Sequence, residues 1–292
     1  MKNLSLKIIA LTFLSISFFS CDSDEKNADL NLNITGLENL GNEYIYEGWI
    51  IVDGNPISTG FFSVDDNGNM SQNEFSIDKS DLESASTFVL TIEPSPDNDP
   101  APSSVHVLAG DFGSNSASLT ISHPAALGDD FSTAAGQYIL ATPTDGGSMD
   151  NEDSGVWFLD PSGPSATLDL PTLPAGWAYE GWAVINGAPV STGTFTSVDQ
   201  ADDAAPYSGS AGGPPFPGED FLVNAPANQT FPTSLLGSTI VISVEPVPDN
   251  SPNPFTLKPL AAAVPSDLEP HTLAGLNNNI SNTPIQGTAT RK

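Results

Sequence analysis

The sequence predicts an all-β protein built from two tandem immunoglobulin-like β-sandwich domains. Glycine and proline are abundant, with 25 and 26 copies among 292 residues, which favours many turns and few long helices. Short runs rich in aromatic and β-branched residues recur between these turns. No helical periodicity of useful length is visible after residue 20. Two long segments are also repeated, which indicates that the fold occurs twice.

The repeat has two parts in the same order. Residues 46–62 read YEGWIIVDGNPISTGFF and residues 179–195 read YEGWAVINGAPVSTGTF, with ten of seventeen positions identical. Residues 91–102 read TIEPSPDNDPAP and residues 243–254 read SVEPVPDNSPNP, with seven of twelve identical. The offset grows from 133 to 152 residues, so the second copy carries an insertion between its two motifs. Such self-similarity predicts two homologous domains.

Each copy reads as strands separated by turns. In the first copy, residues 46–52 are predicted to form a strand that turns at 53–56 and returns over 57–63 as a hairpin. Residues 87–92 form a compact apolar strand that Glu93-Pro94 closes, because proline lacks an amide donor. A further strand is expected over 105–109. The corresponding strand segments of the second copy are 183–185, 190–191, 239–244 and 255–257.

Domain boundaries follow from the repeats and the loops. The first β-sandwich repeat is predicted over 29–128, and the second over 129–270 with inserted loops. An acidic loop at 145–153 is expected inside the second domain, because strand-like pieces flank it, and 202–217 is the inserted loop. Residues 271–292 are expected to be a C-terminal tail.

The N-terminus predicts export and lipid attachment. Residues 1–20 combine two lysines with a short apolar run, as in a secretory signal peptide, and this run is too short for a transmembrane helix. The only cysteine, Cys21, follows directly and resembles the acylated cysteine of a bacterial lipoprotein; an ordinary secretory signal is the alternative. Two or more acyl chains give stable membrane anchoring. Residues 21–28 would form an acidic tether.

Composition excludes several classes of partner. There are 36 acidic against 7 basic side chains, a net charge of −29, and the acidic excess grows once residues 1–20 are removed. Nucleic-acid binding needs clustered lysine and arginine, so it is not expected. A single cysteine allows no intrachain disulfide and no thiolate metal cluster. No cofactor-binding motif such as a phosphate loop is present.

At the repeated motifs, the chain resembles the extracytoplasmic C-terminal domain of the anti-sigma-K factor family. The resemblance rests on the Tyr-x-x-Trp strand with its Gly-x-Phe return strand and on the Glu-Pro loop that follows, and it covers most of the mature chain twice. It implies a shared extracytoplasmic fold. The cytoplasmic sigma-binding domain and transmembrane helix of that family have no counterpart here, so sigma-factor sequestration is not implied. The matching residues are Tyr46, Trp49, Gly60, Phe62, Glu93 and Pro94, and Tyr179, Trp182, Gly193, Phe195, Glu245 and Pro246.

The repeated motif also contains the candidate site residues. Four recurring carboxylates could serve as general acids and bases, as in glycoside hydrolysis. A structural role is favoured, because a carboxylate that holds the fold is expected in both copies. The repeated tryptophans could stack on a ligand, but an aromatic residue in a strand is more often core. The residues of this motif are Tyr46, Glu47, Trp49, Glu93, Tyr179, Glu180, Trp182 and Glu245.

Metal binding is not predicted. The acidic loop at 65–69 superficially resembles a calcium loop, but Met70 and Ser76 stand where glycine and glutamate are needed. The three histidines show no short metal-ligand spacing. No Gly-x-Ser-x-Gly nucleophile motif occurs either.

Three functional hypotheses remain at this point. The favoured one is a non-catalytic, lipid-anchored cell-envelope protein that binds or senses an envelope protein or polymer through loops 65–73, 145–154 and 202–218. The second is an accessory regulator of an anti-sigma system acting through a membrane partner. The third is a glycan-active hydrolase using Glu47 and Glu180.

Overall fold

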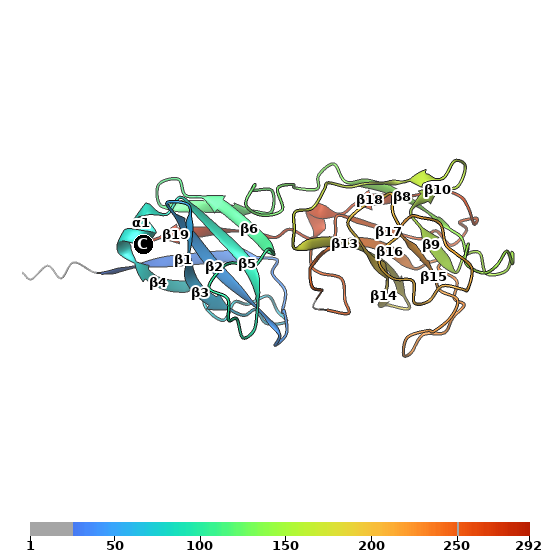
Figure 1. Ribbon diagram of the computed structural model, residues 1–292, viewed down its shortest axis with the longest axis horizontal. Coiled ribbons are helices and arrows are strands. Elements are labelled where there is room, and N and C mark those ends of the chain that lie inside the picture. The colour runs from blue at the N-terminus through green and yellow to red at the C-terminus, as the bar shows by residue number, and fades with distance from the viewer. Residues whose placement is uncertain (1–25, 250) are drawn as a thin grey trace, which may run out of the picture.

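The computed structural model describes residues 26–249 and 251–292, so the predicted signal peptide and Cys21 lie outside the described residues. The chain is nearly all β, with 42% strand and 3% helix, in two β-sandwich or barrel-like domains. The domains follow one another along the long axis of the molecule (Figure 1). The all-β prediction is therefore confirmed.

The first domain is an eight-stranded sheet within the described part of the chain, in the order β3-β2-β5-β6-β7-β19-β1-β4. A single helical turn, α1, follows β4 and begins at the Asp78 cap, whose side chain accepts hydrogen bonds from two backbone amides. The elements are β1 (Asn27–Thr35), β2 (Tyr44–Val52), β3 (Asn55–Phe62), β4 (Glu74–Asp78), α1 (Lys79–Ser84), β5 (Thr87–Pro94), β6 (His106–Asp111), β7 (Ser116–Thr120) and β19 (Gln286–Arg291).

The second domain has a sheet with the path β14-β13-β16-β17-β18-β8-β9-β15, and β12 pairs with β8 beside that path. A small β10-β11 hairpin lies between β9 and β12. The elements are β8 (Ala135–Leu140), β9 (Gly155–Trp157), β10 (Leu159–Asp160), β11 (Ser165–Ala166), β12 (Leu168–Asp169), β13 (Trp177–Ile185), β14 (Ala188–Phe195), β15 (Gly218–Asp220), β16 (Thr239–Pro246), β17 (Leu260–Ala263), β18 (Ala274–Asn278) and the 3-10 turn η1 (Ile280–Asn282).

The two strand orders match when β3, β2, β5, β6, β7 are set against β14, β13, β16, β17, β18. The strand beside β7 is β19, whereas the strand beside β18 is β8. Each repeat therefore contributes seven strands to the path of its own sheet and sends the strand that follows them, β8 or β19, into the other domain. The chain crosses between the domains twice, which Figure 1 shows as a red strand lying among the blue and cyan ones.

This exchange corrects the expectation of a C-terminal tail at 271–292. That segment contains β18, which pairs with β17 and β8, and β19, which lies between β1 and β7. The boundary predicted at 128 also does not separate two independent sheets, because 286–291 belongs to the first one. Helix α1 was not predicted; it is only six residues long, too short to show a helical period.

The repeated Tyr-Glu-Gly-Trp segment forms the same hairpin in both domains. Its two-residue turns have positive φ at both positions, 51° and 80° at Asp53-Gly54 and 52° and 82° at Asn186-Gly187. This backbone matches the twist of the flanking strands, which explains the Asp-Gly and Asn-Gly pairs. Both hairpins contain a register shift directly after the glycine of the motif.

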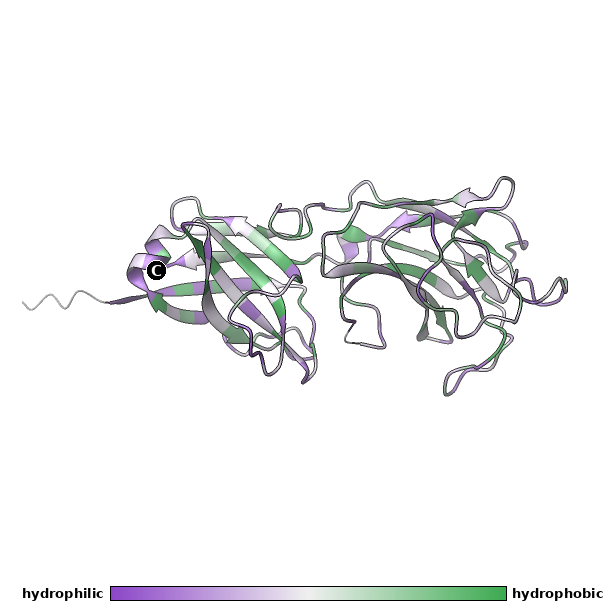
Figure 2. Ribbon diagram, in the orientation of Figure 1, coloured by the Kyte–Doolittle hydropathy of each residue, from purple (hydrophilic) through white to green (hydrophobic). Residues whose placement is uncertain are grey.

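The apolar core runs through both domains as one contiguous cluster of buried side chains. Figure 2 shows the alternating hydropathy along the strands that this core requires. The domains also approach each other closely, because a side chain at Gly176 would collide with the Ser104 carbonyl of the first domain. Among the described residues, no helix is long and apolar enough to cross a bilayer.

Candidate functional site

The repeated motif builds a buried polar chain on the sheet of each domain. In the first domain, the Trp49 Nε1 group donates to Thr91 Oγ1 at 2.9 Å, and Thr91 Oγ1 donates to the Glu93 carboxylate. The same carboxylate accepts the Ser103 backbone amide at 2.9 Å. Trp49 and Glu93 are each 2% exposed. These hydrogen bonds therefore link β2, β5 and the loop after β5.

The second domain repeats this chain with a serine in the middle. Trp182 Nε1 donates to Ser243 Oγ at 2.8 Å, and Ser243 Oγ donates to the Glu245 carboxylate. Glu245 also accepts the Phe255 amide at 2.8 Å. In both repeats the glutamate before proline thus accepts from a hydroxyl two residues earlier and from a backbone amide ten residues later.

The first glutamate of the motif is buried as well. Glu47 and Glu180 accept hydrogen bonds from Ser58 and Ser191 of the neighbouring strand. The second carboxyl oxygen of Glu47, Glu180 and Glu245 has no partner among the described residues. Burial raises the pKa of Glu47 and Glu245 to about 7 and that of Glu180 to about 8. Burying a neutral carboxylic acid costs less free energy than burying a carboxylate.

Most of the predicted site residues are therefore buried and engaged in contacts within the fold. Tyr46 and Tyr179 are buried in the core, and their hydroxyls donate to the backbone carbonyls of Glu38 and Pro171. Trp49 and Trp182 are each only 2% exposed, so neither ring offers a face to a ligand. Glu47 and Glu180 lie in different domains, so the structure does not bring them together.

The calcium-like loop is held by its own side chains. Asp65 accepts the backbone amides of Asn67 and Asn69, both at 2.9 Å, and the Asn69 side-chain amide. These bonds lower the pKa of Asp65. Within residues 26–249 and 251–292, no group of three or more histidine and acidic side chains is arranged to hold a metal ion.

A different feature sets the second domain apart from the first. Gly287 of β19 faces Leu119, and Gly136 of β8 faces Leu276, so these glycines are equivalent. Four residues further along β19 and β8, the partners are Leu30 and Val156.

The equivalence extends to the next strand. Leu30 faces Phe75 of β4, whereas Val156 faces Glu219 of β15. Both Phe75 and Glu219 are buried. A carboxyl group therefore occupies the place that a core phenylalanine fills in the first domain. Burying a carboxylate costs free energy unless it is hydrogen-bonded, so this exchange needs compensation.

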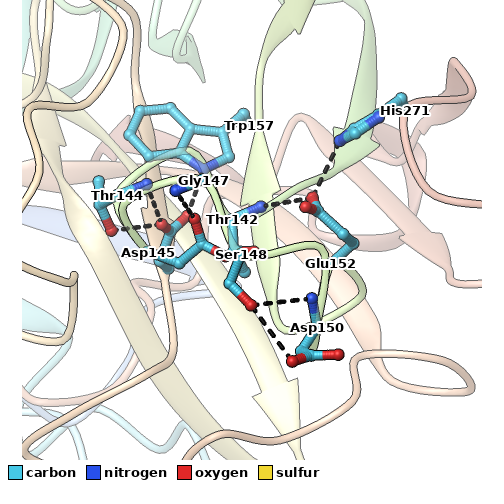
Figure 3. A network of polar contacts seen from close by, with 10 residues as sticks. Thr142, Thr144, Asp145, Gly147, Ser148, Asp150, Glu152, Trp157 and His271 are labelled. Carbon is cyan, nitrogen blue, oxygen red and sulfur yellow. Dashed lines mark hydrogen bonds and ion pairs between the residues drawn. The ribbon is translucent and has the colours of Figure 1, made fainter.

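Protein donors provide that compensation. Glu219 accepts the Ser208 hydroxyl and the Tyr207 amide of the inserted loop. The adjacent Asp220 is fully buried, and it accepts Trp157 Nε1 at 2.7 Å and both the amide and the hydroxyl of Thr144. Figure 3 shows Thr144 and Trp157 next to each other, beside Asp145 and Gly147 of the acidic loop. The two carboxylates thus attach the 202–217 insertion and the 145–153 loop to the sheet.

A pocket of about 370 Å³ is formed largely by the inserted segment, and Thr144 and Trp157 complete its lining. Asp202 lies in its wall and accepts the Gly218 amide at 2.9 Å through one carboxylate oxygen. Burial raises the pKa of Asp202 to about 7, and the nearby Glu219 contributes. The neighbouring Asp203 is exposed and also lines the pocket. The pocket therefore presents the carboxylates of Asp202 and Asp203, and the buried carboxyl groups of Glu219 and Asp220 hold the surrounding backbone in place.

The loop at 145–153 has a second attachment beside the pocket. Glu152 accepts the Thr142 amide and contacts His271 Nε2 at 2.9 Å, as Figure 3 shows. His271 itself has a positive φ of 61°. Asp145 accepts the Gly147 amide at 2.7 Å, which holds the tip of the turn. Residues of the acidic loop are thus ordered by local hydrogen bonds.

Sequence reasoning identified loops 145–154 and 202–218 but not the groups that hold them. Glu219, Asp220 and Trp157 were missed because their partners lie more than 60 residues away or within an insertion that has no counterpart in the first repeat. The available signal was the pair of adjacent acids directly before the apolar run at 221–223. Adjacent acids entering a strand are unusual unless one of them is satisfied inside the protein.

Comparisons with known proteins returned no similarity: no family model matches the chain, and neither a curated protein nor a solved structure is significantly similar to it.

Proposed function

We propose that this chain is an exported, lipid-anchored, non-catalytic protein of the cell envelope that binds a cationic partner through the pocket of its second domain. Its fold is a tandem of immunoglobulin-like domains, anchored through acylated Cys21 and similar in its repeated motif to the extracytoplasmic domain of anti-sigma-K factors. The observation that carries the proposal is a pocket lined by Asp202 and Asp203, next to the buried Glu219 that takes the place of a core phenylalanine.

The chemistry of the pocket selects its ligand class. Asp202 keeps one oxygen outside the Gly218 hydrogen bond, and Asp203 is exposed beside it. Residues 129–285 contain 18 acidic side chains and one basic side chain, so the surrounding field is strongly negative. Such a field raises the local concentration and the association rate of cations. A lysine or arginine side chain of an envelope protein, or an amine on a polymer, fits this site.

Binding of a cationic probe tests the proposal. We expect a fluorescent hexa-arginine peptide to bind the mature chain in 150 mM salt, and Asp202→Asn to weaken binding about tenfold, roughly the 1.4 kcal/mol of one favourable charge contact. The matched control is Asp53→Asn, which removes the same charge and installs the residue that the second repeat carries at this turn. Equal weakening by both variants would mean that net charge alone attracts the peptide.

The pH dependence gives a second readout. Because burial raises the pKa of Asp202 to about 7, its carboxyl group is largely neutral at pH 6 and ionised at pH 8. We therefore expect tighter peptide binding at pH 8 than at pH 6, with the difference lost in Asp202→Asn. An affinity that does not change with pH would remove Asp202 from the site.

A further inference from the structure

The basic residues of this acidic protein are gathered at one end. Only five basic side chains follow Cys21, and four of them are Lys26, Lys79, Arg291 and Lys292. These four lie at the end of the first domain that faces away from the second domain, where the chain enters β1 and leaves β19 (Figure 1). The second domain, with its acidic loops, occupies the opposite end.

Backbone hydrogen bonds hold this basic end together. The Lys79 amide donates to the Lys26 carbonyl at 2.9 Å, and the Lys292 amide donates to the Asp29 carbonyl at 2.8 Å. The Arg291 guanidinium lies over the Phe112 ring at 3.8 Å and donates to carbonyls that include Ala85. Arg291 is therefore part of the framework, and its position fixes the neighbouring lysine.

A cavity of about 610 Å³ opens between these elements. The residues that line it include Lys79, Lys292, Asp29 and Glu83. Within the described residues, the Lys79, Asp29 and Glu83 side chains make no hydrogen bond or ion pair. Lys292 Nζ donates to Asn31 at 2.9 Å and lies 3.5 Å from a carboxylate oxygen of Glu74 at the surface. The cavity thus combines one uncommitted cation, Lys79, with two uncommitted carboxylates, Asp29 and Glu83, and Lys292 adds a second cation that is only held at the surface.

We propose that this cavity seats a zwitterionic phospholipid headgroup of the membrane in which the protein is anchored. The phosphate is bound by Lys79 and Lys292, and the headgroup amine by Asp29 or Glu83. This inference rests on the proposed acylation of Cys21. The six residues from Cys21 to Asn27 span at most about 20 Å, so the cavity stays within reach of the headgroups.

The distribution of charge supports this orientation. Residues 129–285 have a strong negative excess, which an anionic membrane surface repels, whereas three basic and two acidic residues line the cavity at the basic end. Seating the basic end on the headgroups would therefore direct the acidic pocket away from the bilayer. The same anchored chain would then present its proposed binding site outward.

A chemical-shift titration of the full mature chain carrying Cys21→Ser tests the cavity without acyl chains. The probe is glycerophosphoethanolamine, the soluble headgroup, and inorganic phosphate is the comparison. We expect saturable shifts at the Lys79 and Lys292 amides, no shift at Asp203, and at least fivefold weaker binding of phosphate. Lys79→Gln should weaken headgroup binding at least fivefold, and Glu83→Gln should reduce the preference for the headgroup over phosphate.

The outcomes separate this inference from the proposed function. Absence of shifts at the cavity, or equal binding of phosphate and headgroup, overturns the headgroup site even if Cys21 carries fatty acid in cells. Saturable headgroup binding that depends on Lys79 supports it whether or not peptide binding to the second domain is observed. Lys79 is exposed, and its substitution removes no hydrogen bond of its side chain, so the variant is expected to fold.

Discussion

Gly136 and Gly287 occupy the same position in the two domains, although each belongs to the repeat of the opposite domain. Gly136 of β8 faces Leu276, and Gly287 of β19 faces Leu119. A Cβ atom at Gly287 would lie 2.6 Å from the Asn33 carbonyl oxygen, and one at Gly136 would lie 2.7 Å from a Leu168 methyl group. Both glycines therefore let the exchanged strand approach its neighbour closely.

This relationship makes the first domain depend on the end of the chain. We expect Gly287→Ala to destabilise the first domain by about 1–3 kcal/mol, because the added carbon collides with backbone that cannot move freely. Hydrogen exchange followed by mass spectrometry should then show faster exchange in β1 and β7. The control is Gly275→Ala in β18, where nothing lies within 4 Å of the added carbon. Faster exchange confined to the second domain would contradict the strand exchange.

The buried hydrogen bonds from Trp49 through Thr91 to Glu93 can be tested against the second domain, which has a serine in place of the threonine. Thr91→Val removes the hydroxyl that accepts from Trp49 and donates to Glu93. The buried Trp49 N–H is then unpaired and Glu93 keeps only the Ser103 amide, at a cost of about 1–3 kcal/mol. Thr91→Ser installs the residue that the second domain uses at Ser243 and should be nearly neutral. Urea unfolding curves of both variants give the comparison, and an equal cost for both would mean that packing of the methyl group dominates.

The buried glutamates give the stability a pH dependence of predictable sign. Their pKa values are raised to about 7 or 8 in the folded chain, from 4.5 as the ordinary value. As the pH rises, these groups therefore lose their protons in the unfolded chain before they do so in the folded chain. Their contribution to the free energy of unfolding is fully present below about pH 4.5 and is lost as the pH rises to about 8.

We expect the free energy of unfolding to fall between pH 5 and pH 8, and the double variant Glu180→Gln, Glu245→Gln to show a shallower fall. Urea unfolding at several pH values measures this. Because the overall negative charge also grows with pH, we compare the slope of the free energy of unfolding against pH between the unmodified protein and the double variant. Identical slopes would show that these two carboxyl groups do not titrate in this range.

Lipid attachment is tested at the residue that carries it. We expect Cys21→Ser to abolish incorporation of labelled palmitate and to move the protein from the membrane fraction to the soluble fraction of cells. The Lys26→Gln variant, which alters the charge of the tether and keeps the thiol, should remain membrane-bound. Labelling of the serine variant, or a membrane-bound serine variant, would leave the lipoprotein hypothesis without support.

The local structure was predictable because it depends on near neighbours along the chain. Asp53-Gly54 and Asn186-Gly187 predict hairpin turns by their tolerance of positive φ, and the strand before each turn is rich in aromatic and β-branched residues. The repeat itself predicted two similar sheets, and the position of Glu93 before proline predicted where β5 ends. The predicted insertion at 202–217 lies where the second domain has its pocket.

What the tertiary structure alone decided is which strand completes each sheet and where the buried charges meet. β19 alternates small and polar residues that would suit an exposed tail, and it becomes a central strand only because β1 and β7 leave their hydrogen-bonding groups open between them. Glu219 and Asp220 are bonded to Ser208 and Thr144, groups separated by 11 and 76 residues. The periodicity of a sequence predicts only which face of a single segment is buried. The pairing of β19 and the hydrogen bonds of Glu219 and Asp220 depend instead on the free energy of closing long loops, which a local pattern does not contain.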